Sequence, residues 1–293
     1  MKVAVVGSGV MGLGITQAFA QSEGYEVNLC VVSGKGFDHK RALLEKPLKR
    51  QVVKGKITQE RMDEIMGKIT ICDINGCNEA DLIVESAIEN LQAKETLLKE
   101  IEEIAKPDAL IASNTSSLSI TEISSELTRP IIGMHFFNPA AVMKLVEVIP
   151  GMTTTREMVE KVKKISEDIG KVPVEVIEGP GFVVNRLLIP LINDAIQIFE
   201  EGLASVEGID TAMKLGANHP MGPLALGDLI GLDVCLAIME VMYHETLDPK
   251  YRPARLLRKM VRAGRLGQKS GKGFYEYNEL GRIIPGSALS TIG

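Results

Sequence analysis

The 293-residue sequence lacks several features that would assign it to whole classes of protein. Its four cysteines are scattered without a CxxC pair, and its four histidines do not stand at metal-ligand spacing. This pattern argues against a zinc site or a disulfide scaffold, so we expect no metal and reduced thiols packed as small hydrophobic groups. No apolar run approaches the roughly 18 residues of a membrane span, and the N-terminus reads as a strand, not a signal peptide. We therefore expect a cytoplasmic protein.

Basic charge is also in short supply. The chain has 33 lysines and arginines against 38 acidic residues, which gives a formal net charge of −5. This balance argues against nucleic acid as a partner, although a local basic patch for a phosphorylated small molecule is compatible with it. The content of 45% apolar residues is that of a globular protein, and the length suits two domains, each with its own core.

What the sequence does contain is a regular alternation of short apolar segments with helical stretches up to about residue 180. These segments are mostly apolar and do not alternate with polar residues, which is typical of strands buried on both faces of a sheet. Because helices are expected between most of them, the fold class is α/β, with a Rossmann-type, doubly wound and mostly parallel sheet. The expected strands are residues 3–6, 27–32, 69–72, 82–85, 110–113, 131–134 and 145–149.

Individual residues refine this pattern. Pro173 limits the apolar segment 172–176 to an edge strand, because proline cannot donate to a sheet ladder. Pro47 should kink or split the helix that follows the second strand. Ser119 and Glu122 have the spacing of a capping box, which predicts that a helix starts there.

The pattern changes at residues 178–181, and no convincing strand follows. We expect long helices at 183–201, bent by Pro190, and at 228–246, with a shorter helix between Ser205 and Gly216. The chain is therefore divided into a domain of residues 1–181 and an all-helical C-terminal domain of residues 182–293. Apolar residues in 229–242 cover more than one helical face, which indicates either a homodimer interface or a central helix of a monomer.

Three glycines follow the first strand directly and open a helix. In the run GSGVMG, Gly7 permits a tight turn, Gly9 lets a pyrophosphate approach the backbone, and Gly12 lets helix and strand pack closely. The N-terminus of the helix then offers N–H groups and a partial positive charge to the phosphates. The sequence therefore predicts that the first domain binds a dinucleotide.

The end of the second strand departs from the usual dinucleotide pattern. An acidic residue about 20 positions after the glycines normally holds the ribose 2′-hydroxyl, but Val31 stands there. A carboxylate about 5 Å from a 2′-phosphate would cost roughly 3 kcal/mol per charge pair, so its absence removes the usual barrier to NADP. Ser33 can donate to the phosphate and Lys35 can neutralise it. We expect NADP(H), with weak use of NAD(H) as the alternative.

A histidine with a possible acidic partner lies further along. His135 stands between Met134 and two phenylalanines at the end of an expected strand, and Glu147 follows twelve positions later. Such a pair is suited to acid–base chemistry at neutral pH. The alternative for each residue is a structural one, namely a buried core histidine and an exposed acid on an edge strand.

Several blocks occur in one order along the chain. Besides the glycine loop, they are residues 113–117 (SNTSS), 135–139 (HFFNP), 144–147 (KLVE), 179–186 (GPGFVVNR) and 218–223 (NHPMGP). With these blocks the chain resembles the 3-hydroxyacyl-CoA dehydrogenases over essentially its full length. It looks most like the short bacterial members that act on 3-hydroxybutyryl-CoA. The resemblance implies a Rossmann-type domain followed by a helical domain for substrate binding and dimerisation.

The resemblance also implies roles for individual residues. His135 corresponds to the catalytic histidine, Glu147 to its acidic partner, Ser116 to the active-site serine and Asn185 to the asparagine of the GPGFVVNR block. Both Ser116 and Asn185 can donate hydrogen bonds to the substrate oxygen. Their alternative roles are a helix-entry residue for Ser116 and a helix cap for Asn185.

Further residues are assigned by the same resemblance to the cofactor and the substrate. Glu89 and Lys94 match residues on the nicotinamide side of the cofactor, and Asn138 is placed with them. Arg50 and Lys54 match basic residues that contact the phosphates of CoA, and a solvated charged surface is their alternative. Val31 and Pro47 depart from the family pattern, so they bear on cofactor preference and on the shape of the CoA site.

The expected activity is the reversible oxidation of 3-hydroxybutyryl-CoA to acetoacetyl-CoA, with hydride transfer to NAD(P) and a short acyl-CoA as the binding partner. Two alternatives remain at this stage. One is a dehydrogenase of a free hydroxy acid, although the helical domain lacks the lysine-plus-asparagine block of such enzymes. The other is a non-catalytic relative that only binds a dinucleotide, which would not need a proton acceptor.

Overall fold

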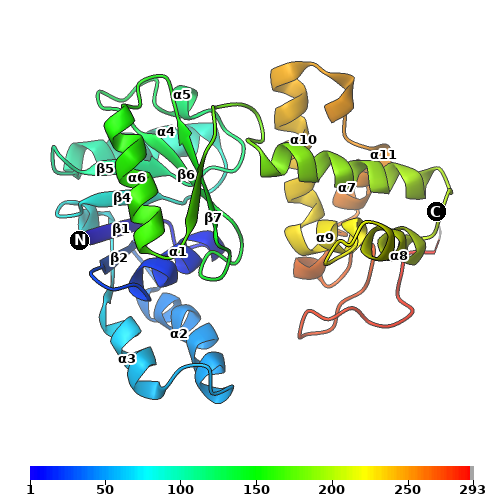
Figure 1. Ribbon diagram of the computed structural model, residues 1–293, viewed down its shortest axis with the longest axis horizontal. Helices are drawn as coiled ribbons and strands as arrows, with labels where there is room; N and C mark the ends of the chain where they lie inside the picture. The colour runs from blue at the N-terminus through cyan, green and yellow to red at the C-terminus, as the bar shows by residue number, and fades with distance from the viewer. Residues whose placement is uncertain (291–293) are drawn as a thin grey trace. The chain divides into compact units, whose positions relative to one another are not determined.

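The computed structural model describes residues 1–290. The chain forms two compact units, Met1–Gly179 and Pro180–Gly293 (Figure 1). Among the described residues, no helix is both long enough and apolar enough to cross a membrane.

The first unit is built on an eight-stranded sheet with the strand order β3-β2-β1-β4-β5-β6-β7-β8. Neighbouring strands are parallel except for β6 and β7, which are antiparallel. The mostly parallel sheet expected from the sequence is therefore confirmed. The strands are β1 (Lys2–Val6), β2 (Glu26–Cys30), β3 (Ile69–Cys72), β4 (Leu82–Glu85), β5 (Leu110–Ser113), β6 (Ile132–Phe136), β7 (Leu145–Pro150) and β8 (Val172–Glu175).

Burial explains why these strands lack polar alternation. Every residue of β4 and β6 is buried, because these strands lie inside the sheet and both of its faces are covered. By contrast, β8 is partly exposed and lies at the edge, where its Pro173 costs no ladder hydrogen bond.

The helices of the first unit pack around this sheet (Figure 1). They are α1 (Val10–Ala20), α2 (Phe37–Val53), α3 (Gln59–Gly67), α4 (Leu91–Ile104), α5 (Ile120–Ile123) and α6 (Arg156–Asp168), with a 3₁₀ turn η1 (Ile74–Cys77). The helices α2 and α3 project together beyond the sheet.

The sequence predicts that Pro47 kinks or splits this helix, but α2 is not split. The helix continues through the proline for 17 residues. Leu44 and Leu48, on either side of it, are fully buried in the core. The Leu44 carbonyl also accepts a hydrogen bond from the Gln17 side chain at 2.7 Å. This packing compensates for the hydrogen bond that the proline removes.

The capping residue Ser119 starts α5 as expected. Its Oγ accepts a hydrogen bond from the Glu122 N–H at 3.0 Å, and the helix is only four residues long. Glu178, near the end of the first unit, also contacts this turn, because its Oε1 accepts from the Thr121 N–H at 2.8 Å. A residue distant in sequence thus completes the cap.

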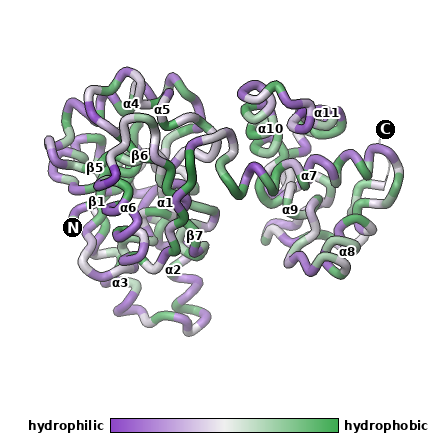
Figure 2. Tube along the Cα trace, turned by 45° about the horizontal axis from the view of Figure 1, so that its top comes forward, coloured by the Kyte–Doolittle hydropathy of each residue, from purple (hydrophilic) through white to green (hydrophobic). Residues whose placement is uncertain are grey.

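The second unit contains only helices and short bridges among its described residues. Hydrophobic and hydrophilic residues alternate along its first helix, as expected for a helix with one buried face (Figure 2). The helices are α7 (Val184–Glu200), α8 (Val206–Gly216), α9 (Pro223–Ile230), α10 (Leu232–Thr246) and α11 (Arg255–Arg262), with 3₁₀ turns η2 (Pro249–Tyr251) and η3 (Gln268–Ser270).

The expectation of one continuous helix over residues 228–246 is wrong. Gly231 separates α9 from α10 with a φ of +104°. The chain turns there because the Leu232 N–H donates to the carbonyl of Leu266 at 3.1 Å instead of continuing the helical ladder. Only glycine adopts this backbone conformation at little cost.

A buried carboxylate ties the C-terminal segment to α9. Asp228 is fully buried, and it accepts hydrogen bonds from the N–H groups of Phe274 and Tyr275, each at 2.9 Å, and from the Tyr277 hydroxyl at 3.0 Å. Burial raises the pKa of Asp228 to about 6, although these hydrogen bonds favour the charged form. The folded chain therefore binds a proton at this site more readily than the unfolded chain does.

This raised pKa predicts a specific pH dependence of stability. Between about pH 4 and pH 6, folded Asp228 holds a proton that the unfolded chain releases, so the free energy of unfolding should fall as pH rises through this window. The loss should be on the order of 2 kcal/mol in the wild type and absent in Asp228→Asn. Urea unfolding at several pH values measures it, with the exposed Asp168→Asn as control. Equal pH slopes in wild type and Asp228→Asn would contradict the prediction.

Candidate active site

The glycine loop between β1 and α1 is shaped by two close backbone contacts. Gly7 has a φ of +116°, and a Cβ atom there would lie 2.3 Å from the carbonyl oxygen of Ser86. A Cβ atom on Gly12 would lie 1.9 Å from the carbonyl oxygen of Gly7. These two glycines are therefore required by the packing of the loop itself.

Gly9 differs, because a Cβ atom there would meet nothing within 4 Å. It caps α1 without a side-chain hydrogen bond, and the first turn of α1 contains no acidic residue. The protein leaves open space beside the N–H groups and positive end of a helix, which suits a pyrophosphate. The residues present thus fit a dinucleotide.

The end of β2 carries no carboxylate. Val31 is buried, and the loop after it turns through a hydrogen bond of 2.8 Å from the Gly34 N–H to the Val31 carbonyl. Ser33 and Lys35 are both exposed on this turn. The structure therefore places both candidate phosphate ligands on the loop that follows the second strand.

Lys40 is a residue that the sequence reasoning missed. It lies on α2, and its ammonium group donates to the carbonyl oxygen of Ser8, inside the glycine loop, at 3.1 Å. It thereby adds positive charge close to the loop that would hold the cofactor phosphates. No sequence pattern indicated this contact, because 32 residues separate Lys40 from Ser8.

The two strands β6 and β7 bring the candidate base to its acidic partner. His135 and Glu147 are paired directly opposite each other in the antiparallel ladder, and opposite residues project from the same face. Nδ1 of His135 lies 2.8 Å from Oε2 of Glu147. Both side chains are buried, at 7% and 1% exposure. An ionised carboxylate can only accept, so Nδ1 carries the proton in this pair.

An aromatic side chain packs against this histidine, and a polar side chain holds the backbone of the next residue. The ring of Phe137 packs against it, with 4.4 Å between ring centroids. The side chain of Asn114, which follows β5, accepts a hydrogen bond from the Phe136 N–H at 2.8 Å and donates to Ser86 Oγ at 3.2 Å. Asn114 lies within the SNTSS block, but its spacing from Phe136 did not reveal this contact.

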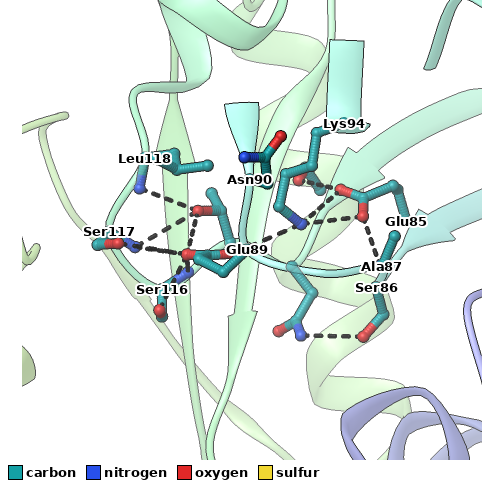
Figure 3. Close-up of polar contacts among 12 residues, drawn as sticks. Glu85, Ser86, Ala87, Glu89, Asn90, Lys94, Ser116, Ser117 and Leu118 are labelled. Atoms are coloured by element: carbon teal, nitrogen blue, oxygen red, sulfur yellow. Dashed lines mark hydrogen bonds and ion pairs between the residues drawn. The ribbon is translucent and has the colours of Figure 1, made fainter. Parts of the chain in front are cut away.

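Ser116 is held by Glu89 (Figure 3). Oε1 of Glu89 accepts hydrogen bonds from the Ser116 N–H at 2.7 Å and the Ser116 hydroxyl at 2.9 Å. The same oxygen accepts from the hydroxyl of Thr115 at 2.7 Å and from the N–H of Ser117 at 3.1 Å. One carboxylate oxygen therefore organises the whole turn after β5.

Lys94 supplies positive charge beside the two carboxylates of this site. It is fully buried, with its Nζ 2.9 and 3.0 Å from the two carboxylate oxygens of Glu85 and 3.5 Å from Glu89. Burial favours a higher pKa for Glu89, but Lys94 and the hydrogen bonds from Thr115 and Ser116 keep the pKa below its ordinary value. Lys94 has no exposed surface, so its contact with the site runs through Glu89.

The loop between β6 and β7 is fixed by a lysine that the sequence reasoning also missed. The buried ammonium group of Lys171 donates to the carbonyl oxygens of Ala140 and Met143 at 2.7 and 2.8 Å. Burial lowers the pKa of Lys171. Asn138 is exposed on the same loop, and its peptide bond to Pro139 is cis. The loop after His135 is thus held at its far end.

The remaining site residues lie elsewhere. Arg50 and Lys54 line a surface pocket of about 510 Å³ on α2, together with Lys46 and Lys49. Asn185 is half-buried near the start of α7, in the second unit. Within residues 1–290, no group of three His, Cys, Asp or Glu side chains could hold a metal ion.

Comparison with known families matches both units of the chain. The family model for the 3-hydroxyacyl-CoA dehydrogenase, NAD binding domain, matches residues 2–179. The model for the 3-hydroxyacyl-CoA dehydrogenase, C-terminal domain, matches residues 181–277. The first match indicates a nicotinamide dinucleotide as the cofactor.

Individual relatives agree with these matches. The chain is 52% identical over 282 residues to 3-hydroxybutyryl-CoA dehydrogenase of Clostridioides difficile, which covers 95% of this chain and 100% of the relative. It is 48% identical to a probable 3-hydroxybutyryl-CoA dehydrogenase of Bacillus subtilis, over 95% and 98% of the two chains. The crystal structure of (S)-3-hydroxybutyryl-CoA dehydrogenase from Ralstonia eutropha superposes with a TM-score of 0.89 at 46% identity, over 95% and 99%. The chain therefore belongs to the 3-hydroxyacyl-CoA dehydrogenase family, oxidoreductases that act on a CH–OH group with NAD(P).

Proposed function

We propose that this chain catalyses the reversible oxidation of 3-hydroxybutyryl-CoA to acetoacetyl-CoA. The observation that carries the proposal is the buried pair of His135 and Glu147, 2.8 Å apart. The pair occurs in a chain whose similar relatives are named 3-hydroxybutyryl-CoA dehydrogenases. A protein that only bound the cofactor would have no need of a buried proton acceptor.

His135 serves as the general base. A neutral ring that donates from Nδ1 to Glu147 carries its lone pair on Nε2, which can take the proton of the substrate hydroxyl. Glu147 then stabilises the imidazolium that forms. A nicotinamide dinucleotide held at the glycine loop would supply the acceptor for the hydride that leaves the substrate carbon. In the reverse direction, His135 returns the proton to the substrate oxygen.

Ser116 and Asn185 are proposed to contact the substrate oxygen, because each can donate a hydrogen bond to it. The hydroxyl of Ser116 donates to Glu89 at 2.9 Å, so donation to substrate requires this hydroxyl to turn. Glu89, Lys94 and Asn138 are proposed to form the nicotinamide side, with Lys94 acting through Glu89.

Loss of the base should reduce turnover much more than binding. We expect His135→Gln to lower kcat by about 10² or more, the usual scale for general acid–base catalysis, and to leave cofactor affinity nearly unchanged. Steady-state kinetics and cofactor titration measure the two quantities. His244→Gln, at an exposed position on α10, serves as the control. Wild-type turnover in His135→Gln would refute the role of the histidine.

NADP(H) is the proposed cofactor in preference to NAD(H). The end of β2 lacks an acidic residue, and Ser33, Lys35 and Lys40 place hydroxyl and ammonium groups around the loop that follows it and the glycine loop. These groups favour a 2′-phosphate through charge-assisted hydrogen bonds. Gly7, Gly9 and Gly12 with the start of α1 are proposed to hold the pyrophosphate.

Cofactor preference can be tested by substitution. We expect a lower KM for NADPH than for NADH, and Val31→Asp should reverse this order because the new carboxylate repels a 2′-phosphate by roughly 3 kcal/mol. Lys40→Ala should raise the KM for both cofactors, because its ammonium group lies beside the glycine loop that is proposed to hold the pyrophosphate they share. Dissociation constants of both cofactors, measured without substrate, provide an independent reading. An unchanged ratio of the two KM values in Val31→Asp would contradict the explanation.

The CoA part of the substrate is proposed to bind along α2. Arg50 and Lys54 line a pocket there with two further lysines, and their charges suit the phosphates of CoA. Initial rates of reduction of acetoacetyl-CoA and of free acetoacetate, each with NADPH and NADH, test the proposed function. Faster reduction of free acetoacetate would favour the hydroxy-acid alternative. Cofactor binding without turnover of either compound would favour the non-catalytic alternative.

The assembly is proposed to be a cytoplasmic homodimer formed through the helical unit. Large apolar side chains are exposed on this unit, including Leu187 at 71%, Leu203 at 75% and Leu247 at 74%. Burial of such side chains in a subunit interface would remove them from water. Analytical ultracentrifugation should find particles of twice the 31.8 kDa chain mass. A monomer at micromolar concentration would contradict this arrangement.

A further inference from the structure

Three thiols that are scattered in sequence meet at one end of the sheet. Cys30 ends β2, Cys72 ends β3 and Cys77 ends η1. The Sγ atom of Cys30 lies 4.0 Å from that of Cys72 and 4.0 Å from that of Cys77. Their scattered positions in the sequence indicate separate packing residues, but the fold gathers them beside the loop that follows β2.

The pairing of β2 and β3 suits a disulfide between Cys30 and Cys72. These residues are register partners in the two parallel strands. Neighbouring strands lie about 4.8 Å apart, which is within the Cα separation of roughly 4.4–6.8 Å that disulfides span. The two sulfur atoms need only approach each other from 4.0 Å to about 2.05 Å.

Gly76 leaves the room for this approach. A Cβ atom at this position would lie 2.3 Å from Sγ of Cys72 and 3.1 Å from Sγ of Cys30. Any other residue would press on the sulfur atoms, and its φ lies outside the left-handed region, so backbone conformation does not demand a glycine. The glycine therefore serves the packing of the thiols.

Exposure assigns different roles to the two thiols. Cys30 is fully buried, whereas Cys72 is half-buried and can meet a small oxidant. The hydrogen bond with Cys30 and burial both raise the pKa of the Cys72 thiol. The neutral thiol reacts slowly, so the site should respond to millimolar peroxide and not to air.

We propose that Cys72 and Cys30 form a redox modification site. The Cys72 sulfur attacks a peroxide oxygen, the O–O bond breaks, and Cys72 becomes a sulfenic acid as water leaves. The Cys30 sulfur then attacks the Cys72 sulfur, a second water leaves, and the S–S bond forms. Two thiols are oxidised by two electrons and hydrogen peroxide is reduced to two water molecules.

The disulfide would act on the dinucleotide loop, a step that rests on the proposed cofactor site. The Cys30 carbonyl accepts a hydrogen bond of 3.0 Å from the Gly7 N–H, and the Cys72 carbonyl accepts one of 2.8 Å from the Val31 N–H. Drawing the two strand ends together shifts both hydrogen bonds. Oxidation should therefore weaken cofactor binding.

The test uses the full chain with hydrogen peroxide as the oxidant. After treatment with about millimolar peroxide, non-reducing digestion and mass spectrometry should identify a peptide that joins Cys30 to Cys72. The dissociation constant of NADPH should rise by about two- to tenfold, the scale of one hydrogen bond, and return after reduction with dithiothreitol. Cys72→Ser should abolish both effects.

Matched variants make the outcome decisive. Cys77→Ser and Cys235→Ser should still form the Cys30–Cys72 link, because neither thiol belongs to the pair. Absence of this link, or a Cys30–Cys77 link in its place, would overturn the assignment. A link that leaves the NADPH dissociation constant unchanged would overturn the effect on the loop. Because peptide mapping needs no cofactor, failure of the reduced protein to bind NADPH would count against the proposed cofactor site alone.

Discussion

The antiparallel pairing of β6 with β7 is the constraint on which the candidate site depends. The sheet is parallel up to β6, and the reversal places Glu147 directly opposite His135. Had β7 continued the parallel pattern, a crossover helix would separate the two residues, and no short loop would join the strands. The loop that makes the reversal possible is held by the buried Lys171. The position of the proposed base is thus a property of sheet topology.

Buried ion pairs also hold the site together. Lys94 is buried and lies 2.9 Å from Glu85 and 3.5 Å from Glu89, so one cation offsets part of the negative charge of two carboxylates. Burying a single charged side chain costs desolvation free energy, and the attraction between Lys94 and the two carboxylates offsets part of this cost. Glu85 also accepts from the Ser113 hydroxyl at 2.5 Å at the end of β5. A side-chain hydrogen bond therefore joins the carboxyl ends of β4 and β5 in addition to the ladder.

Much of this architecture could be read from the sequence, because it depends on local patterns. The continuous apolar segments predicted the strands, and the spacing of Gly7, Gly9 and Gly12 predicted the turn after β1. The features that the sequence did not predict share a cause, because each depends on a contact between residues that are distant in sequence. The break at Gly231 depends on Leu266, and the position of Lys40 depends on Ser8. The meeting of Cys30 and Cys72 required the register of β2 and β3.

The three glycines of the loop after β1 are needed for different reasons. Gly7 and Gly12 are enforced by neighbouring backbone atoms, whereas Gly9 has open space around it and a φ of −76° that any residue adopts. A mutation at Gly7 or Gly12 would damage the folded chain and expose it to cellular quality control. A protein with a mutation at Gly9 would still fold, so it would escape quality control and accumulate as an intact but inactive chain. Natural selection would thus detect the two kinds of change at different stages of the protein's life.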